Sequence, residues 1–385
     1  MSFKKLQKKV GLAFDIGTAS VSAALFELRG DDPRPYVLKI FRKFHTASLN
    51  RDASHFSKST VGQFSAILKD VGIELKGVMP EMYVVGLSSI FYLGKTEHIY
   101  MKYPKPRSIT SADTASSINQ GQQKFLADIG NSDVVIIEEV LMRSFLNGYR
   151  VDQPIGKSAE EVESWVHFAG TSRELYDTFT SIIKGARSDA HIRFSTFPVT
   201  TWLLMQEMLE PEHSALVIDI GGELTEVTFL VDGVITEIVS LPFGVLNILL
   251  RISESERIDT DNALSLLKSY TAQTLAPEIS LRIHGIIKKE MKLWEEIFER
   301  IWQRAARDIM SDIKMFFLGG GSLVGDMKTA IAQPLLHPDL ARGLHVSVIQ
   351  PEAFQDKFSM FGAFDGPGDF GLMSLIASTR YYTQE

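Results

Sequence analysis

One short pattern occurs twice in this chain and constrains its fold more than any other feature. In each copy an apolar run ends in an aspartate, a glycine turn follows, and a second apolar run begins. The copies span residues 12–28 and 216–231, with Asp15 and Asp219 at equivalent places. Strand, tight turn and strand predict a β-hairpin. Glycine lets backbone N–H groups approach an anion, and a carboxylate can hold a hydrated cation. Two such turns predict that the chain folds into two halves, which face each other and bind a phosphate between their turns.

The composition excludes several classes of protein. A chain of 385 residues with 45% hydrophobic and 23% charged residues predicts two globular domains. A net charge of -7 argues against nucleic acid as a partner. The chain has no cysteine, which excludes disulfides and thiolate chemistry and agrees with a cytoplasmic location. Apolar runs stay shorter than the roughly 18–20 residues of a membrane-spanning helix. We therefore expect membrane contact to be peripheral or indirect, at the inner face of the cell membrane.

Apolar periodicity predicts alternating strands and helices along the rest of the chain. A helix over residues 60–71, ended by Gly72, precedes a strand over residues 83–87. Residues 88–187 differ in character and indicate a small α/β insertion. We expect the insertion to contain strands at 134–140 and 165–169, a turn at 147–150, and a helix opened by a capping box at Thr171. The remaining expected helices cover residues 200–208, 286–310 and 370–379.

A third glycine turn follows a buried strand near residue 318. Here Gly319, Gly320, Gly321 and Ser322 precede another expected helix. A strand that ends in glycines is weak evidence by itself, because glycine turns are often purely structural. The order of the three turns is more specific. Hairpin, insertion, hairpin and then a strand–glycine–helix turn resembles the phosphate 1, phosphate 2 and adenosine pattern of the actin-like ATPase superfamily.

Within that superfamily the chain most resembles FtsA, the bacterial division actin homologue, with the pilus-assembly protein PilM as the nearest rival. The insertion falls in the first half of the chain, as in FtsA and PilM, and segments 147–157 and 241–244 resemble FtsA. The resemblance implies an α/β, actin-like (ribonuclease-H-like) fold of two domains with duplicated sheets. The implied units are a first domain over 1–87 and 188–212, an inserted subdomain over 88–187, and a second domain over 213–385.

The resemblance also implies ATP and Mg²⁺ as ligands, held at residues that match the family's motifs. Asp15 and Asp219 are expected to hold the metal, with Asp219 near the attacking water as the candidate catalytic residue. The implied nucleotide contacts are Asp15, Gly17, Thr18, Ala19, Ser20, Gly221, Gly222, Glu223, Thr225, Lys268, Gly319, Gly320, Gly321 and Ser322. Aligned amides and a cation would do most of the binding.

Two departures from the family shape the functional prediction. Glu223 stands where a third glycine is expected, and Glu226 stands where the family has aspartate. A carboxylate beside a terminal phosphate is repulsive, so we expect weak ATP hydrolysis or none, at most a slow ATPase. We expect no counterpart of the membrane-binding helix of FtsA after the helix over residues 370–379, so membrane contact would use a partner or the Lys-rich first residues.

The implied function is an ATP-binding scaffold of cell division that links a division-ring protein (FtsZ-like) to the membrane machinery. Self-polymerisation is an expected property of such a scaffold. Two alternatives stay open. One is a PilM-like cytoplasmic adaptor of type IV pilus assembly that binds a pilus inner-membrane peptide. The other is a nucleotide-free pseudo-ATPase scaffold, suggested by Glu223. A metabolic kinase of the same superfamily is disfavoured, because no substrate motif with a catalytic base lies between the hairpins.

Overall fold

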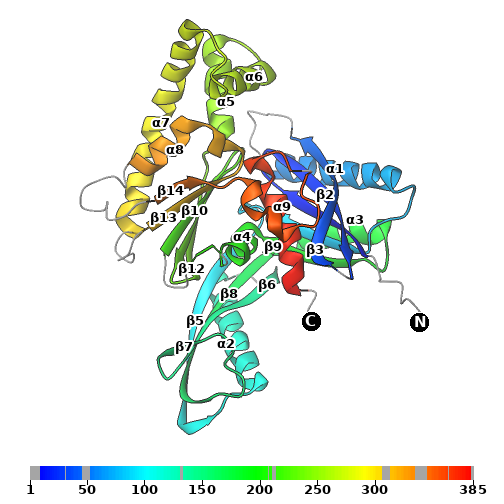
Figure 1. Ribbon diagram of the computed structural model, residues 1–385, viewed down its shortest axis with the longest axis vertical. Coiled ribbons are helices and arrows are strands. Elements are labelled where there is room, and N and C mark those ends of the chain that lie inside the picture. The colour runs from blue at the N-terminus through cyan, green and yellow to red at the C-terminus, as the bar shows by residue number, and fades with distance from the viewer. Residues whose placement is uncertain are drawn as a thin grey trace.

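Two five-stranded sheets with the same strand order form the centre of the molecule (Figure 1). The computed structural model describes residues 9–30, 32–45, 53–130, 133–206, 208–209, 214–305, 313–333, 345–362 and 364–382. The first sheet, in the order β3-β2-β1-β4-β9, contains β1 (Lys9–Ile16), β2 (Ser20–Arg29), β3 (Asp32–Phe44), β4 (Met82–Leu87) and β9 (His191–Thr196). The second, in the order β12-β11-β10-β13-β14, contains β10 (Ser214–Ile220), β11 (Thr225–Val231), β12 (Val234–Leu241), β13 (Ile313–Leu318) and β14 (His345–Val348). The duplicated sheets of an actin-like α/β fold are therefore confirmed.

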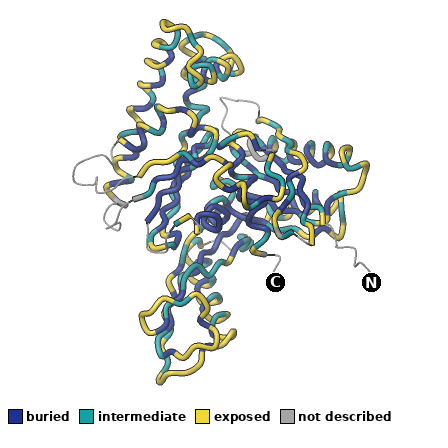
Figure 2. The backbone as a smooth tube through the Cα atoms, in the orientation of Figure 1, coloured by how far each residue is buried: buried dark blue, intermediate teal, exposed yellow. Residues whose placement is uncertain are grey.

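The central strands are apolar on both faces because helices cover both faces. In β1, Leu12 and Phe14 pack with α1 (Ala53–Glu74) and α3 (Arg173–Ala186), while Ala13 faces the other way. Between the two sheets lie α4 (Phe197–Met205) and α9 (Phe370–Tyr382), whose side chains join residues of both sheets in one core. Figure 2 shows this buried centre where the two lobes meet. The lobes are thus held together by apolar packing as well as by their turns.

Helices around the first sheet differ from the sequence prediction: α1 begins at Ala53 and not near residue 60, α4 covers Phe197–Met205 and not residues 200–208, and two further differences have a visible cause. Gly72 does not end the first helix: α1 continues to Glu74, and the left-handed Gly77 (φ +87°) follows it. The capping residue of α3 is Ser172, whose hydroxyl accepts from the backbone N–H of Leu175, and not Thr171. The Thr171 hydroxyl instead donates to the carbonyl of Phe91 at 2.6 Å. A tertiary contact of Thr171 explains the start of α3, whereas α1 ends in a local turn, in which the Gly77 N–H donates to the Gly72 carbonyl at 2.8 Å.

The outer face of the second sheet carries a separate helical layer. This layer contains α5 (Val245–Glu256), α6 (Thr260–Thr271), α7 (Pro277–Ala305) and α8 (Gly325–Ala332). The apolar period of residues 286–310 predicts a buried stripe that includes Met291, Trp294 and Phe298, and these side chains are buried in one core with the second sheet. Residues 306–310 of that expected helix lie outside the described residues.

The insertion folds as a four-stranded antiparallel sheet backed by one helix. It contains β5 (Leu93–Ser108), β6 (Val134–Leu146), β7 (Tyr149–Val151), β8 (Ser158–Ser172) and α2 (Ser111–Ile129), in the strand order β5-β8-β6-β7. The predicted strands fall within β6 and β8. The predicted turn is confirmed by left-handed Asn147 (φ +50°) and Gly148 (φ +80°). The insertion projects away from the helical layer of the second domain (Figure 1).

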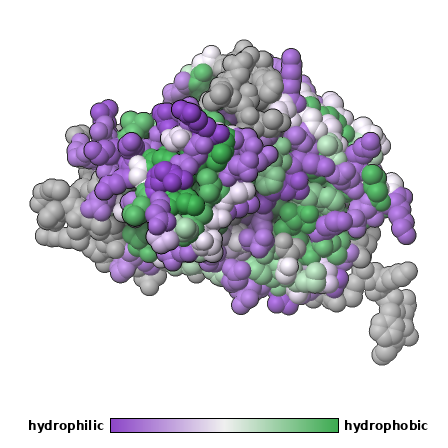
Figure 3. Space-filling model, turned by 90° about the horizontal axis from the view of Figure 1, so that it is seen from above, coloured by the Kyte–Doolittle hydropathy of each residue, from purple (hydrophilic) through white to green (hydrophobic). Residues whose placement is uncertain are grey.

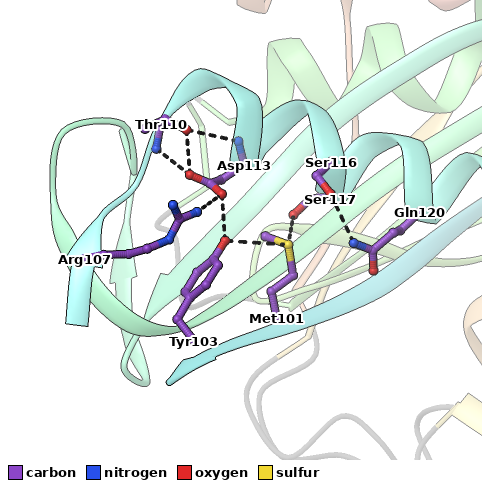
Figure 4. Close-up of polar contacts among 8 residues, drawn as sticks. All are labelled: Met101, Tyr103, Arg107, Thr110, Asp113, Ser116, Ser117 and Gln120. Carbon is purple, nitrogen blue, oxygen red and sulfur yellow. Dashed lines mark hydrogen bonds and ion pairs between the residues drawn. The ribbon is translucent and has the colours of Figure 1, made fainter. Parts of the chain in front are cut away.

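A polar cluster fixes the start of α2 near the tip of the insertion (Figure 4). The Thr110 backbone and hydroxyl both donate to Asp113, and Thr110 accepts the Asp113 backbone N–H in return. Tyr103 donates to the same carboxylate at 2.9 Å, and Arg107 forms an ion pair with it. These bonds, led by the Thr110 hydroxyl, lower the pKa of Asp113 to about 2. The insertion therefore has its own capped and internally bonded frame.

Helices α9 and α3 pack outside the domains to which the boundaries predicted from the sequence assign them. The final helix α9 follows the expected second-domain start at residue 213, yet it packs on β1 and β4 of the first sheet. Helix α3 lies inside the expected insertion range, yet its Phe179 and Ile183 belong to the core of the first sheet. In the part of the chain that the structure describes, no helix is long and apolar enough to cross a membrane.

Candidate functional site

Two turns of the same geometry lie at the ends of β1 and β10. In the first, the Gly17 N–H donates to the Ser20 carbonyl at 3.0 Å, and in the second the Gly221 N–H donates to the Leu224 carbonyl at 2.9 Å. Asp15 and Asp219 each occupy the last position but one of their strand. The two hairpins read from the sequence therefore form, and they carry equivalent carboxylates.

The two turns touch each other. The Glu223 backbone N–H donates to the Thr18 hydroxyl at 3.0 Å. A Cβ added to Gly222 would lie 2.4 Å from the Cβ of Ala19, so only glycine allows this approach. The structure thus brings residues 17–20 and 221–223 together from opposite lobes. A phosphate oxygen that uses the Glu223 amide has to share or displace the bond to Thr18.

The segment after β12 supports the second turn from behind. The backbone N–H groups of Val245 and Leu246, at the start of α5, donate to the carbonyls of Gly221 and Gly222 at 3.1 and 2.8 Å. The Thr225 hydroxyl donates to the Phe243 carbonyl at 2.8 Å and is fully buried. Thr225, predicted as a nucleotide contact, therefore bonds within the second domain.

The third glycine turn closes against the base of the second. Gly319 has φ +76°, and a Cβ there would lie 2.2 Å from Asp219 Oδ1 and 2.6 Å from the Ile220 carbonyl. Gly321 packs equally closely on the Ile220 side chain, whereas a Cβ on Gly320 would meet nothing within 4 Å. The buried Ser322 hydroxyl donates to the Gly319 carbonyl at 2.8 Å. Gly319 and Gly321 must therefore be glycine to pack this closely on β10, whereas Gly320 faces open space.

Lys268 is the one predicted contact that lies apart from the turns. It is exposed near the end of α6, a helix that packs against α5 and α7 at the outer end of the helical layer (Figure 1). On the same helix, the Tyr270 hydroxyl lies 3.0 Å from Asp326 and 2.9 Å from His284 Nδ1. These side chains join α6 and α7 to α8, directly after the third turn.

The carboxylates of Asp15 and Asp219, where the two turns meet, are partly buried, and their charges interact. Burial raises the pKa of Asp219 to about 8, and the neighbouring Glu226 and Asp15 carboxylates raise it further. Burial also raises the pKa of Asp15 to about 6; the Arg42 guanidinium opposes this shift, and Asp369 adds to it. Two half-buried carboxyl groups in one field have the chemistry of a site for a hard divalent cation, which favours oxygen ligands.

Two side chains that were not predicted, Arg42 and Asp369, place opposite charges near the first carboxylate, Asp15. Arg42 Nε donates to the Ser22 hydroxyl at 2.7 Å, and the same guanidinium pairs with the buried Asp369. A Cβ added to Gly371, in the first turn of α9, would lie 2.6 Å from Asp15 Oδ2. No sequence signal connects Arg42 or Asp369 to Asp15, because they come from distant segments.

Glu226 connects the second carboxylate to the start of the insertion. It pairs with Asp219 across the hairpin, and the Tyr92 hydroxyl donates to its Oε2 at 2.8 Å. Burial raises the pKa of Glu226 to about 7, against the effect of hydrogen bonds from Tyr92 and Ser89. Tyr92 is 7% exposed and lies directly before β5. The carboxylate next to the candidate metal ligand therefore contacts the segment that leads into the inserted subdomain.

Tyr92→Phe is expected to lower the free energy of unfolding by about 1–2 kcal/mol, because it removes a donor from the buried Oε2 of Glu226. Tyr83→Phe is the matched control. Tyr83 is also buried, but its hydroxyl has no hydrogen-bond partner. Urea denaturation of both variants measures the difference. Equal stabilities for the two variants would show that the Tyr92 bond contributes nothing.

The ligand-free protein is expected to lose stability as the pH rises from 6.5 to 8. Asp219 (pKa about 8), Glu226 (about 7) and the buried Glu138 of β6 (about 7, raised by burial) keep protons in this range that the unfolded chain has released. The folded state therefore binds more protons, and the free energy of unfolding falls by about 1–3 kcal/mol. Denaturant titrations at several pH values test this, and a flat or rising profile contradicts it.

The residues at the paired turns suit the Mg²⁺ ion of a magnesium nucleotide better than they suit its phosphates. Asp219 has only carboxylates among the charges that shift its pKa, so a cation would relieve that repulsion. No cluster of three potential metal-binding side chains occurs in the described part of the chain, so water and phosphate oxygens would complete the shell. Glu223, whose backbone N–H lies at the second turn, adds a negatively charged residue to the phosphate side.

Comparison with known proteins places the fold. No family model matches the chain, and no curated protein matches it. Among solved structures, the PilM-PilN type IV pilus biogenesis complex aligns with a TM-score of 0.64 at 15% identity, over 96% of this chain and 98% of that chain. The ethanolamine utilization protein EutJ from Carboxydothermus hydrogenoformans aligns at 0.48 with 12% identity, over 96% of this chain and 89% of that chain. The archaeal actin homolog Ta0583 aligns at 0.43 with 14% identity, over 96% and 99%.

The paired turns, duplicated sheets and whole-chain match define a protein with the actin-like ATPase fold. Within that fold the arrangement, with a subdomain inserted into the first half of the chain, is of the FtsA/PilM type. The fold expected from the sequence is thereby confirmed.

Proposed function

We propose that this protein is a PilM-like adaptor that binds ATP and Mg²⁺ between its paired turns and holds a pilus-assembly partner at the cytoplasmic face of the membrane. The observation that carries the proposal is the contact of residues 17–20 with residues 221–223, on a fold that matches the PilM–PilN structure along nearly the whole chain. The partner in that structure is PilN, and a PilN-type segment is the partner proposed for this chain.

The site supports a binding role more than transfer of a phosphoryl group to a second substrate. Asp15 and Asp219 would hold the metal, and backbone amides of the two turns would hold the phosphates. Magnesium would supply charge neutralisation for the phosphates and for both carboxylates. Any hydrolysis by water is proposed to be slow, with Glu223 opposing a tightly bound terminal phosphate.

Calorimetric titration with Mg–ATP tests the nucleotide part of the proposal. We expect binding in the micromolar range or tighter, which corresponds to at least about 8 kcal/mol. Glu223→Gly is expected to tighten binding, because it removes a carboxylate from the second turn. No binding at millimolar Mg–ATP would leave the nucleotide-free scaffold as the function.

A competition between two peptides tests the partner. One is the cytoplasmic segment of a PilN-type protein of the same organism, and the other is the carboxyl-terminal tail of its tubulin-like division protein. We expect the protein to bind the pilus segment and to ignore the division tail. The opposite preference would favour the division scaffold, which the resemblance of segments 147–157 and 241–244 to FtsA supports.

A further inference from the structure

His45 contacts the first turn at two carbonyl groups. It follows β3 directly, and its backbone N–H donates to the Ala19 carbonyl at 2.9 Å. Its ring Nε2 lies 3.3 Å from the Gly17 carbonyl oxygen, and its Nδ1 lies 3.1 Å from the Ser59 hydroxyl of α1. The ring therefore lies between helix α1 and the turn.

The partners of His45 fix which ring nitrogen carries the proton. A carbonyl oxygen only accepts hydrogen bonds, so Nε2 carries the proton and donates to Gly17. Burial lowers the pKa of His45, and the bond to the Gly17 carbonyl opposes this shift, so the ring is neutral near pH 7. In the neutral ring Nδ1 accepts from the Ser59 hydroxyl. Ser59 thus keeps the proton on the nitrogen that faces the turn.

The second turn has the equivalent carbonyl held by a different group. Gly221 is equivalent to Gly17, because each glycine N–H donates to the carbonyl three residues later. The Gly221 carbonyl accepts the backbone N–H of Val245, at the start of α5, at 3.1 Å. At the first turn the imidazole of His45 takes the place of that helix amide. Both turns therefore have this carbonyl bonded from behind, although by unrelated groups.

A bond to the Gly17 carbonyl also sets the direction of the next amide. The Thr18 N–H belongs to the same planar peptide unit and points the opposite way from that carbonyl, away from His45. Among the described residues this N–H has no acceptor, so it is available to an anion. Viewed from above, hydrophilic surface lies between apolar areas of the two lobes (Figure 3). This surface suits a polar ligand between the turns.

We propose that His45 is a positioning residue of the phosphate site, which holds the Gly17 carbonyl so that the Thr18 amide stays directed at the phosphates of the nucleotide. The inference rests on the nucleotide site proposed above and adds to it a residue that lies outside the glycine turns. His45 is not itself a phosphate ligand in this proposal, because the Gly17 carbonyl uses its Nε2 proton.

Four variants separate this role from simple packing. His45→Phe keeps a ring of similar size and removes both nitrogens, whereas the carboxamide of His45→Gln can still donate to Gly17. Ser59→Ala removes the group that fixes the proton on Nε2. His191→Phe is the matched control, because His191 is exposed at the first position of β9, the end of the sheet opposite the turn.

Two measurements are made on each variant. Hydrogen exchange of the Gly17 amide, followed by NMR without nucleotide, reports the turn directly, and the Gly221 amide of the second turn is the internal control. Calorimetric titration with Mg–ATP reports the affinity of the site. Thermal unfolding establishes that each variant is folded.

His45→Phe is expected to raise the exchange rate of the Gly17 amide at least tenfold, to leave that of Gly221 unchanged, and to weaken Mg–ATP binding at least tenfold. His45→Gln and His191→Phe are expected to bind within threefold of the wild type. If His45→Phe does not fold, Ser59→Ala decides, with an expected rise of at least twofold in Gly17 exchange.

Three results would overturn the proposal: unchanged Gly17 exchange in the decisive variant, wild-type affinity of His45→Phe, or an equal loss of affinity in His45→Gln. A wild type that does not bind Mg–ATP would count against the proposed function instead. The exchange rates would then still decide whether His45 holds the first turn.

Discussion

Gly319→Ala is expected to destabilise the protein by about 3 kcal/mol or more, the largest effect of any single methyl group at the site. The backbone at Gly319 has φ +76° and ψ 166°, a region that only glycine adopts readily. The added Cβ would also lie 2.2 Å from Asp219 Oδ1 and 2.6 Å from the Ile220 carbonyl. Backbone strain and overpacking therefore act together. Urea denaturation measures the change in the free energy of unfolding.

Gly320→Ala provides the control for this substitution. Gly320 is the next residue, has no positive φ, and a Cβ there would meet nothing within 4 Å. Its stability is expected to stay within about 0.5 kcal/mol of the wild type. If Gly319→Ala accumulates only as insoluble protein while Gly320→Ala folds, the expected order still holds. Similar stabilities for both variants would mean that the third turn does not press on Asp219.

Asp219→Asn is expected to change nucleotide affinity and stability in opposite directions. Loss of the carboxylate should weaken Mg–ATP binding at least a hundredfold, because a primary ligand charge for the metal disappears. Without nucleotide the same variant should be more stable at pH 8 by about 1–3 kcal/mol. The reason is that burial and the Glu226 carboxylate hold the pKa of Asp219 near 8, so its ionisation opposes folding. Such opposed effects are typical of a residue kept for function.

Asp232→Asn is the control: it tests whether loss of any aspartate from this hairpin changes nucleotide affinity and stability as Asp219→Asn does. Asp232 lies at the opposite end of β11, its side chain is 58% exposed, and its ion pair with Arg143 is long, at 3.7 Å. We expect neither affinity nor stability to change measurably. Calorimetry and urea denaturation of the two variants make the comparison. An Asp219→Asn protein that binds Mg–ATP like the wild type would remove Asp219 from the metal site.

The local parts of the fold could be predicted from the sequence because each depends on a short segment. The two hairpin turns need only an apolar strand, a glycine and a return strand, and both form. The stripe of Met291, Trp294 and Phe298 needs only the helical period, and it is buried as expected. The positions of Asp15 and Asp219 at their strand ends follow from the same short patterns.

The parts that were missed depend on contacts between distant segments. Strand β5 carries lysines, prolines and few apolar residues, so its pairing with β8 has no clear alternation to predict it. The return of α9 to the first sheet, the contact of Arg42 with Asp369, and the bond from Tyr92 to Glu226 join residues far apart in the chain. Lys268 was predicted by position in a family pattern and stays a prediction; its helix α6 packs against α5 and α7.

A crystal structure with Mg²⁺ and a non-hydrolysable ATP analogue tests the central claim most directly. The account predicts one magnesium ion between Asp15 and Asp219, with the terminal phosphates on the backbone of residues 17–20 and 221–223. Electron density for the analogue elsewhere, or two carboxylates with no metal between them at saturating nucleotide, would contradict it.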